Sequence, residues 1–599
     1  MAENTSPPAH RRLTTVVHVV GVACFGALLT GIAHFSILLV RRYVLGSVTF
    51  AGADIVWMAP LGYLVAFLIA AMPLSLLALL APRLPVWRIA VLVISLLAAF
   101  AMLLLFRQLL PYAALLLAAG VATRMAYAAG PEPAPWIRRM RRPGIAMAAV
   151  VLLATLVVRV GPRLRASWLS SRAPAPPAES PNVLLLVLDA VRAENLGLYG
   201  YARHTTPALE RWAQSGVVFD WAIAPSSWTL PSHSSLFTGL PAGQLSPRWT
   251  RQLDGKHRTL AEVLRGRGYA TGGFVANYWF GCPETGLARG FTHYECHVIT
   301  GRQILRSTTL FQTHMGERLV EARSIRAVLR AIRSLNLKVP DIPDESYMPV
   351  ETVAQAFLRW EAKREQRPFF AFLNFLDVHE RQAPQPYRTR FADRPNTIDR
   401  YDASIAYTDS IIDGLLDSLR VRGVLDRTIV AITADHGELF DASQASKHGT
   451  SLYMPVLRVP LLLRYPPRVP EGRRIEVPVS LQNLAATILD LAGVTGSQLP
   501  GETLARTWTD TGVEPLVLAE LERHVNPRVN GPSSRGALRS IVDARWHYIR
   551  HYIKNEGGFE ELFAYRDDPQ ERTNLKATPE GISAVRRFRA VLDRIPTGY

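Results

Sequence analysis

The hydrophobic positions of this chain fall into two different patterns. Up to residue 161, long apolar runs follow one another with short polar interruptions and show no polar face. The runs are Val16–Val40, Ile55–Leu80, Val86–Phe106, Leu109–Ala128 and Ile145–Val160. Each has about the length of roughly 20 residues that crosses a bilayer as a helix, and the first is too long for a cleaved signal peptide. The pattern predicts an all-α bundle of five transmembrane helices over residues 1–161.

After residue 180, short apolar runs alternate with amphipathic stretches. The short runs are rich in β-branched and aromatic residues, and we expect buried strands at Val183–Leu188, Tyr269–Ala276, Phe369–Phe375 and Thr428–Thr433. The expected helices include Val350–Glu365, Tyr401–Arg422 and Leu481–Ala492, the last with Ser480 as its cap. This alternation predicts an α/β fold, with a mainly parallel central sheet and helices on both faces.

Shifts in composition indicate the domain boundaries. An alanine- and proline-rich run lies within residues 162–180 and predicts an extended, moderately stiff linker. We therefore expect a transmembrane domain over 1–161, a larger soluble domain over 181–515 and a C-terminal subdomain over 516–599 with a strand at Trp546–Tyr552. Residues 297–349 fit no strand pattern, and we expect a basic, mostly helical insertion over the functional site.

Positive charge adds an orientation to this picture. The formal net charge is +18, but no basic run is interleaved with aromatic residues, which argues against a nucleic-acid partner. The side that holds the N-terminus carries Arg11, Arg12, Arg83, Arg88, Arg138, Arg139, Arg141 and Arg142, and the opposite side carries Arg41, Arg42, Arg107, Arg163 and Arg165. Cytoplasmic loops carry the excess of arginine. We expect a multi-pass protein of a bacterial-type inner (cytoplasmic) membrane, with its soluble part on the periplasmic or extracellular side.

The cysteine content leaves the redox compartment open. Cys24 lies in an apolar run, whereas Cys282 and Cys296 lie close together in the soluble part. The latter pair forms a disulfide if the domain is exported, and two free thiols are about as compatible with the sequence.

Candidate metal ligands follow three of the predicted strands. Asp189 follows the first strand, Asp377 and His379 follow another, and Asp435-His436 follows a third. Ligands of open α/β sheets bind beyond the carboxyl ends of the strands, so these groups can converge on one crevice. Aspartate and histidine suit one divalent ion, with zinc or manganese favoured and calcium or magnesium also compatible.

A hydroxyl group lies in a stretch that suits the start of a helix. Thr229 is followed by Leu230-Pro231, and proline is favoured in the first turn of a helix. Backbone N–H groups at such a helix start would face an anion held over Thr229. A threonine hydroxyl needs a metal or a base before it can act as a nucleophile; the alternative is that Thr229 only caps the helix.

In this order, the motifs resemble the sulfatase family of the alkaline phosphatase superfamily. The matching pieces are Pro181-Asn182-Val183 to Asp189, Leu198-Tyr199-Gly200-Tyr201, Pro231-Ser232 to Leu236-Phe237-Thr238-Gly239, Asp377-Val378-His379, Asp435-His436-Gly437-Glu438, His448-Gly449 with Leu452-Tyr453, Glu561-Leu562-Phe563 to Asp568-Pro569, and Asn574-Leu575. The resemblance extends roughly over residues 181 to 580. It implies an alkaline-phosphatase-like sandwich with a mainly parallel sheet.

The resemblance also implies roles for individual residues. Asp189, Asp435 and His436 would hold the metal together with Thr229, which would be the nucleophile. His379 matches the family histidine near the ester oxygen and is the candidate general acid. The candidates for contact with the substrate are His233, Asn277, Lys447 and His448.

The departures from the family pattern concern sulfate chemistry. Sulfatases of the usual type carry Cys-x-Pro-x-Arg, whose cysteine becomes formylglycine, whereas this chain has Thr229-x-Pro231-x-His233. The second of the family's paired aspartates is Ala190, and the Lys-x-His that touches sulfate aligns near Asn277 and Trp279. A threonine nucleophile with a single metal site instead resembles the membrane phosphoethanolamine transferases and lipoteichoic acid synthases.

Together these features predict a membrane-anchored metalloenzyme that acts through Thr229. The favoured hypothesis is transfer or hydrolysis of a phosphoryl or substituted-phosphoryl group on a lipid or envelope glycan. The alternatives are a sulfuric ester hydrolase and a catalytically silent scaffold or sensor. The sequence does not specify the oligomeric state.

Overall fold

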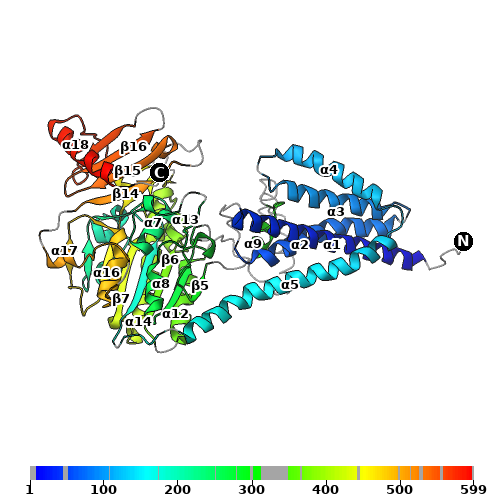
Figure 1. Cartoon of the computed structure of the whole chain (residues 1–599), viewed down its shortest axis with the longest axis horizontal. Helices are drawn as coiled ribbons and strands as arrows, with labels where there is room; N and C mark the ends of the chain where they lie inside the picture. The colour runs from blue at the N-terminus through cyan, green and yellow to red at the C-terminus, as the bar shows by residue number, and fades with distance from the viewer. Residues whose placement is uncertain are drawn as a thin grey trace. The chain divides into compact units, whose positions relative to one another are not determined.

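The computed structural model describes the chain from residue 8 to residue 596 with several gaps. The gaps are 45–51, 82, 107, 173, 178, 248, 250, 278–279, 297–300, 312–347, 365–366, 441–445, 497–498, 511, 513–514, 525–530 and 554–557. The chain divides into two compact units, which we describe separately (Figure 1). One comprises Met1–Leu164 with Ile299–Ser346, and the other Arg165–Val298 with Tyr347–Tyr599.

The first unit contains the predicted helices. They are α1 (Pro8–Tyr43), α2 (Ile55–Leu80), α3 (Val86–Leu103), α4 (Pro111–Ala128) and α5 (Ala134–Ser171). By length and composition, four are able to cross a membrane, and α4, which contains Arg124, is not among them. The linker prediction was wrong at its start, because α5 continues through 162–171. Leucine, arginine and alanine, which are good helix formers, occur in 162–171 and sustain the helix up to the proline-rich stretch.

Part of the insertion between the strands of the second unit belongs to the first unit. Helix α9 (Gly301–Arg306) packs against α2. The hydroxyl of Tyr63 on α2 lies 3.1 Å from Nδ1 of His34 and 3.0 Å from Oγ1 of Thr309, and Thr309 donates to the carbonyl of Ala101 at 2.6 Å. These polar groups are buried and satisfy one another. The rest of the 297–349 insertion lies largely outside the described residues.

A mixed, mainly parallel sheet organises the second unit. Its strand order is β12-β2-β11-β7-β1-β6-β4-β5. The strands are β1 (Asn182–Leu188), β2 (Val217–Phe219), β4 (Ala270–Val275), β5 (His293–Glu295), β6 (Phe369–Phe375), β7 (Thr428–Ala434), β11 (Leu461–Arg464) and β12 (Arg473–Ile475). β7, β1, β6, β4 and β5 run parallel, and β11 is antiparallel to both its neighbours. The predicted α/β class is confirmed.

Helices cover both faces of this sheet. Every residue of β1, β6 and β7 is buried, although side chains alternate between the two faces of a strand. The helices are α6 (Pro207–Ala213), α7 (Thr229–Thr238), α8 (Leu260–Gly266), α12 (Val350–Lys363), α13 (Asp377–Glu380), α14 (Thr397–Val421), α15 (Met454–Leu457), α16 (Leu484–Leu491) and α17 (Arg506–Thr509). Helix α12 packs with α14, and α7 packs with α8 and α16.

A smaller antiparallel sheet follows in the C-terminal part. Its strands are β14 (Val517–Leu521), β15 (Gly536–Val542), β16 (His547–Ile553) and β17 (Glu560–Phe563), in this order. Helix α18 (Pro579–Arg594) packs on it through Val585, Phe588 and Leu592. The short strands β3 (Ala222–Ile223), β10 (Arg458–Val459) and β13 (Val479–Ser480) form a third sheet, and β8 (Leu439–Phe440) pairs with β9 (Ser446–Lys447).

Candidate active site and metal centre

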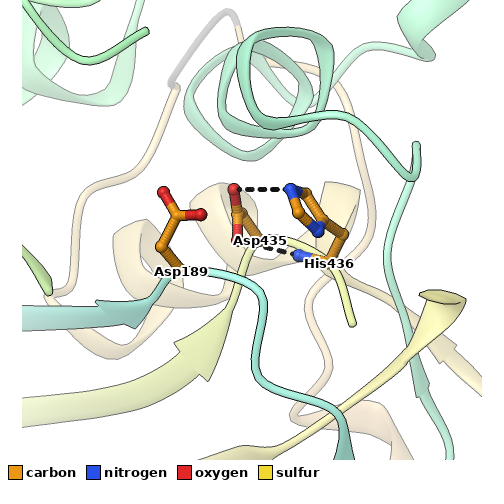
Figure 2. Close-up of side chains that lie close together, drawn as sticks. All are labelled: Asp189, Asp435 and His436. Atoms are coloured by element: carbon orange, nitrogen blue, oxygen red, sulfur yellow. Dashed lines mark hydrogen bonds and ion pairs between the residues drawn. The ribbon is translucent and has the colours of Figure 1, made fainter. Parts of the chain in front are cut away.

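The strand register brings the predicted metal ligands together. Leu188 at the end of β1 is level with Ala434 at the end of β7, so Asp189 and Asp435 follow at the same edge of the sheet. One ligand atom each from Asp189, Asp435 and His436 lies within 4.8 Å of the others (Figure 2). All three side chains are fully buried. Long-range strand pairing thus joins residues that are far apart in the sequence.

The cluster has the chemistry of a cation site. Oδ1 of Asp189 and Oδ2 of Asp435 are buried and accept no hydrogen bond among the described residues. A buried carboxylate oxygen without a partner is unfavourable, and a bound cation would satisfy both oxygens. Two carboxylates and an imidazole suit zinc or manganese, so the residues fit a divalent ion.

His436 is prepared to act as a neutral ligand. Its Nδ1–H donates to the carbonyl of Gly437 at 2.8 Å, which leaves a lone pair on Nε2. Burial lowers the pKa of His436, because the imidazolium form would lose its hydration. Nε2 lies 3.4 Å from Oδ2 of Asp435. The lone pair therefore faces the same space as the unpaired carboxylate oxygens.

The loop after β1 is held in a strained conformation that serves Asp435. Ala190 has a φ of 60°, and its N–H donates to Oδ1 of Asp435 at 3.2 Å. Tyr401 fixes this turn, since its hydroxyl donates to the carbonyl of Ala190 at 2.7 Å and accepts from the N–H of Arg192 at 3.0 Å. Burial acts to raise the pKa of Asp435, but His436, His233 and two backbone N–H groups outweigh it and lower that pKa.

Thr229 directs its hydroxyl toward this cluster. Helix α7 begins at Thr229, and Trp228 occupies the cap position with extended backbone. Oγ1 of Thr229 lies 3.2 Å from Nε2 of His436, so the hydroxyl can donate to that lone pair. The alternative that Thr229 caps the helix is therefore not supported, since its side chain contacts the candidate metal ligand.

His233 lies one turn below Thr229 on the same helix. Its Nδ1–H donates to the carbonyl of Thr229 at 2.9 Å and lies 3.5 Å from Oδ2 of Asp435. The ring is 2% exposed and packs edge-on against Phe372. These contacts connect the helix that carries the hydroxyl to a metal ligand. A direct contact between His233 and the substrate stays a prediction.

Asn277 orients the other carboxylate. Its Nδ2 donates to Oδ2 of Asp189 at 2.8 Å, and its Oδ1 accepts the N–H of Phe280 at 2.9 Å. Asn374, which sequence reasoning missed, accepts the N–H of Asn277 at 3.0 Å and lies 3.4 Å from Asp189 Oδ2. The only signal for Asn374 was an amide within an apolar strand. The predicted substrate contact of Asn277 remains untested, and Trp279 lies outside the described residues.

Two further histidines adjoin the cluster. The ring of His448 stacks on His436 at 4.6 Å and meets His379 edge-on at 5.2 Å between centroids. Nδ1 of His448 donates to Oε1 of Glu438 at 3.2 Å. Burial opposes protonation of His379, but the hydrogen bond to Glu380 and the nearby carboxylates raise its pKa to about 9. Lys447 lies on β9, and its side chain is outside the described residues.

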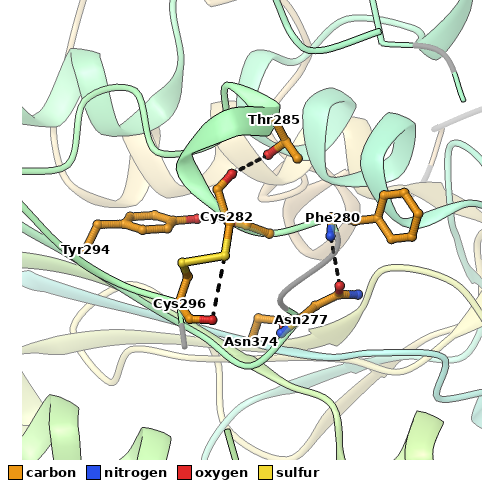
Figure 3. Close-up of a disulfide and its surroundings, with 8 residues drawn as sticks. Asn277, Phe280, Cys282, Thr285, Tyr294, Cys296 and Asn374 are labelled. Atoms are coloured by element: carbon orange, nitrogen blue, oxygen red, sulfur yellow. Dashed lines mark hydrogen bonds between the residues drawn. A yellow bond between two sulfur atoms is a disulfide. The ribbon is translucent and has the colours of Figure 1, made fainter. Parts of the chain in front are cut away.

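A disulfide lies beside the Asn277 loop. Cys282 and Cys296 are bonded, with their Cα atoms 5.4 Å apart (Figure 3). Of the two alternatives that the sequence left open, the structure has the disulfide, and Cys24 is the free cysteine. The bond links the stretch after Asn277 to the end of β5, and so restrains the loop that orients Asp189.

Comparison with known proteins agrees with this architecture. Residues 181–494 match the family model described as Sulfatase, and residues 448–596 match the model described as N-sulphoglucosamine sulphohydrolase, C-terminal. The chain is 28% identical to arylsulfatase A of Homo sapiens over 471 residues, 69% of this chain and 87% of that protein. It is 24% identical to N-acetylgalactosamine-6-O-sulfatase of Bacteroides thetaiotaomicron over 511 residues, 70% of this chain and 94% of that protein.

A solved structure supports the fold independently. The phosphonate monoester hydrolase of Agrobacterium radiobacter superposes with a TM-score of 0.52 at 21% identity, covering 69% of this chain and 94% of that one. This likeness confirms the alkaline-phosphatase-like fold that the motifs implied. The family model extends over more than half of the 599 residues. The chain therefore belongs to the sulfatase family, whose relatives in this comparison are hydrolases and whose members use a metal ion.

Proposed function

We propose that this enzyme transfers or hydrolyses a phosphoryl or substituted-phosphoryl group on a lipid or envelope glycan, through a covalent ester on Thr229. The observation that carries the proposal is the 3.2 Å approach of Thr229 Oγ1 to Nε2 of His436, beside two unpaired carboxylate oxygens. A threonine cannot become formylglycine. A chain of the sulfatase family with threonine at this position therefore needs a different reaction path.

We assign the steps of the reaction to the following residues. Asp189, Asp435 and His436 would hold a divalent ion that lowers the pKa of the Thr229 hydroxyl. Oγ1 attacks phosphorus in line as its proton passes to water, and the bond from phosphorus to the leaving oxygen breaks. His379, protonated at neutral pH, donates a proton to that oxygen. Water or an acceptor alcohol then attacks phosphorus and returns a proton to His379. The bond from phosphorus to Oγ1 breaks, and Oγ1 takes a proton back from water.

The second candidate is hydrolysis of a sulfate ester. It is favoured by the family match and by the names of the relatives, which include an arylsulfatase. A hydrated formylglycine releases sulfate by eliminating it from carbon, whereas a threonine sulfate must be attacked a second time at sulfur. The fold does not choose between the candidates, because sulfatases and a phosphonate monoester hydrolase share it.

The proposed location is a cytoplasmic membrane, with the catalytic unit outside the cytoplasm. The apolar helices support membrane anchoring, and the arginine asymmetry supports a cytoplasmic N-terminus. The proposal takes α4 as a fifth crossing beside the four candidate spans, because only an odd number of crossings places the catalytic unit outside. The Cys282–Cys296 bond supports an oxidising compartment on the catalytic side.

The test incubates the full chain, loaded with manganese or zinc, with envelope lipids or glycans that carry radiolabelled phosphorus or sulfur. The mass and the radiolabel of the Thr229 peptide are then measured. We expect a phosphorus adduct on Thr229. Thr229→Ala should abolish both adduct and turnover, and Thr229→Ser should retain part of each, because only a methyl group is lost. The matched control is Thr238→Ala on the same helix, whose hydroxyl donates to Ser234 at 2.7 Å. A sulfur adduct would establish the second candidate, and full turnover by Thr229→Ala would refute a covalent Thr229 ester in either reaction.

A further inference from the structure

A row of rings leads outward from the metal centre. His448 stacks on His436, and Trp228 stacks on His448 with 5.5 Å between centroids. Trp249 lies tilted against Trp228, and His524 lies tilted against Trp249, each with 4.0 Å between centroids. His436 is fully buried, whereas Trp228, Trp249 and His524 are half-buried. We call His448, Trp228, Trp249 and His524 the aromatic row.

The local backbone is built to hold this row. Gly449 has a φ of 64°, and a Cβ there would lie 2.7 Å from the ring of Trp228 and 2.9 Å from that of Trp249. Its N–H donates to the carbonyl of Ser227 at 2.7 Å, next to Trp228 in the chain. Phe280 meets Trp228 edge-on at 4.8 Å. The positions of both indoles are therefore fixed by close packing rather than by chance exposure.

One polar atom of the row lacks a partner. Nε1–H of Trp228 is buried and meets no acceptor among the residues that the structure describes. A buried donor without an acceptor is unfavourable, and native proteins usually satisfy it. Trp228 directly precedes Thr229, so an oxygen of a ligand esterified at the metal centre is a suitable acceptor. The mechanism above makes no use of this group.

We propose that the aromatic row binds a pyranose ring, so that the substrate of this site is a glycan; the inference rests on the proposed function of the Thr229 site. A pyranose has a C–H face that packs on aromatic faces, and a rim of hydroxyls that needs hydrogen-bonding partners. The row supplies both, since two adjacent indoles lie between two imidazoles. The backbone N–H of Trp249 also lies 3.4 Å from the carboxylate of Glu522, which places this acceptor beside the row. An acyl chain would instead favour an uninterrupted apolar surface.

The test separates recognition of the sugar ring from recognition of the phosphate or sulfate group. Glucose 6-phosphate, ethyl phosphate, glucose 6-sulfate and ethyl sulfate are titrated by calorimetry into the manganese-loaded full chain carrying Thr229→Ala, which prevents turnover. We expect the glucose ester to bind about tenfold more tightly than the ethyl ester of the same acid. A further Trp249→Leu should reduce this ratio to about threefold or less. Trp168→Leu is the matched control, because Trp168 is 53% exposed on α5.

Each outcome decides one question. Equal binding of glucose and ethyl esters, no binding of either glucose ester, or a ratio that survives Trp249→Leu would overturn the glycan proposal. A ring preference that appears only with the sulfates would support the aromatic row, while contradicting the phosphoryl function of Thr229. The two ideas can therefore fail separately.

Discussion

The two unpaired carboxylates make a prediction about stability as well as about catalysis. The candidate ligand atoms of Asp189 and Asp435 lie within 4.8 Å of each other. With an effective dielectric constant of about 20, two unit charges at that separation repel by about 3.5 kcal/mol. Asp189→Asn removes one charge but retains an oxygen that can accept from Asn277 and Asn374, as Oδ2 of Asp189 does. We therefore expect Asp189→Asn to stabilise the metal-free protein by up to about 3 kcal/mol.

A bound metal should remove the stability advantage that the variant has over the wild type. A ligand at a hundredfold excess over its Kd stabilises the native state by about 2.7 kcal/mol. The wild-type protein should gain this stabilisation, whereas Asp189→Asn should gain little, because it has lost a charged ligand. The variant is thus expected to melt above the wild type in chelator and to lose that advantage in zinc or manganese.

The assay is thermal unfolding of the detergent-solubilised full chain, followed by tryptophan fluorescence with chelator and with metal. The matched control is Asp402→Asn, since Asp402 is also fully buried but accepts from Asn195 and Tyr201 and pairs with Arg203. That control should melt lower than the wild type in both conditions. If Asp189→Asn behaves like Asp402→Asn, or binds metal as tightly as the wild type, the assignment of the metal centre is wrong.

Three further predictions concern the general acid, the disulfide and the membrane topology. The pKa of His379 is raised to about 9, so its protonated form is lost as the pH rises through that value and turnover should fall there. A bound cation would offset the effect of Asp189 on this pKa, which shifts the fall to a pH at or below 9. His379→Gln should slow substrates with poor leaving groups more than those with good ones, and turnover that stays unchanged at alkaline pH would contradict the acid role. A thiol count on unreduced, denatured protein should find Cys24 alone, and three free thiols would exclude the disulfide of Cys282 with Cys296. A reporter enzyme fused after α5 should be active only outside the cytoplasm, and cytoplasmic activity would reverse the topology.

Local pattern predicted the central strands well. The observed β6 coincides with the predicted run Phe369–Phe375, because a run that is apolar except for Asn374 is typical of a strand in a sheet covered on both faces. Helix α14 begins at Thr397 rather than at Tyr401, since Asn396 and Asp399 form a capping box that the apolar periodicity does not reveal. The insertion at 297–349 was predicted to be mostly helical, and its helix α9 packs on α2 in the first unit, a contact that no local signal encodes. The position of the insertion over the active site stays a prediction.

The site was predictable where chemistry follows strand ends. Asp189 and Asp435 could be found because parallel strands deliver their following residues to one edge. Tyr401 could not, since a tyrosine within a long helix usually belongs to the core, and only the fold brings its hydroxyl to Ala190. The same holds for Asn374, whose role depends on the neighbouring strand and not on its own sequence context.

The contact of α9 with α2 bears on how this enzyme can be divided for laboratory work. A truncated chain that begins at Arg165 would keep Thr308, Thr309 and Leu310 but lose the helices that bury them. Side chains that the helical bundle normally buries would then be exposed to water, and an exposed apolar surface favours aggregation. Removing 299–346 together with the N-terminal helices takes away both halves of that contact. A water-soluble catalytic unit that does not aggregate therefore requires removal of both 1–164 and 299–346, and removal of the N-terminal helices alone is not enough.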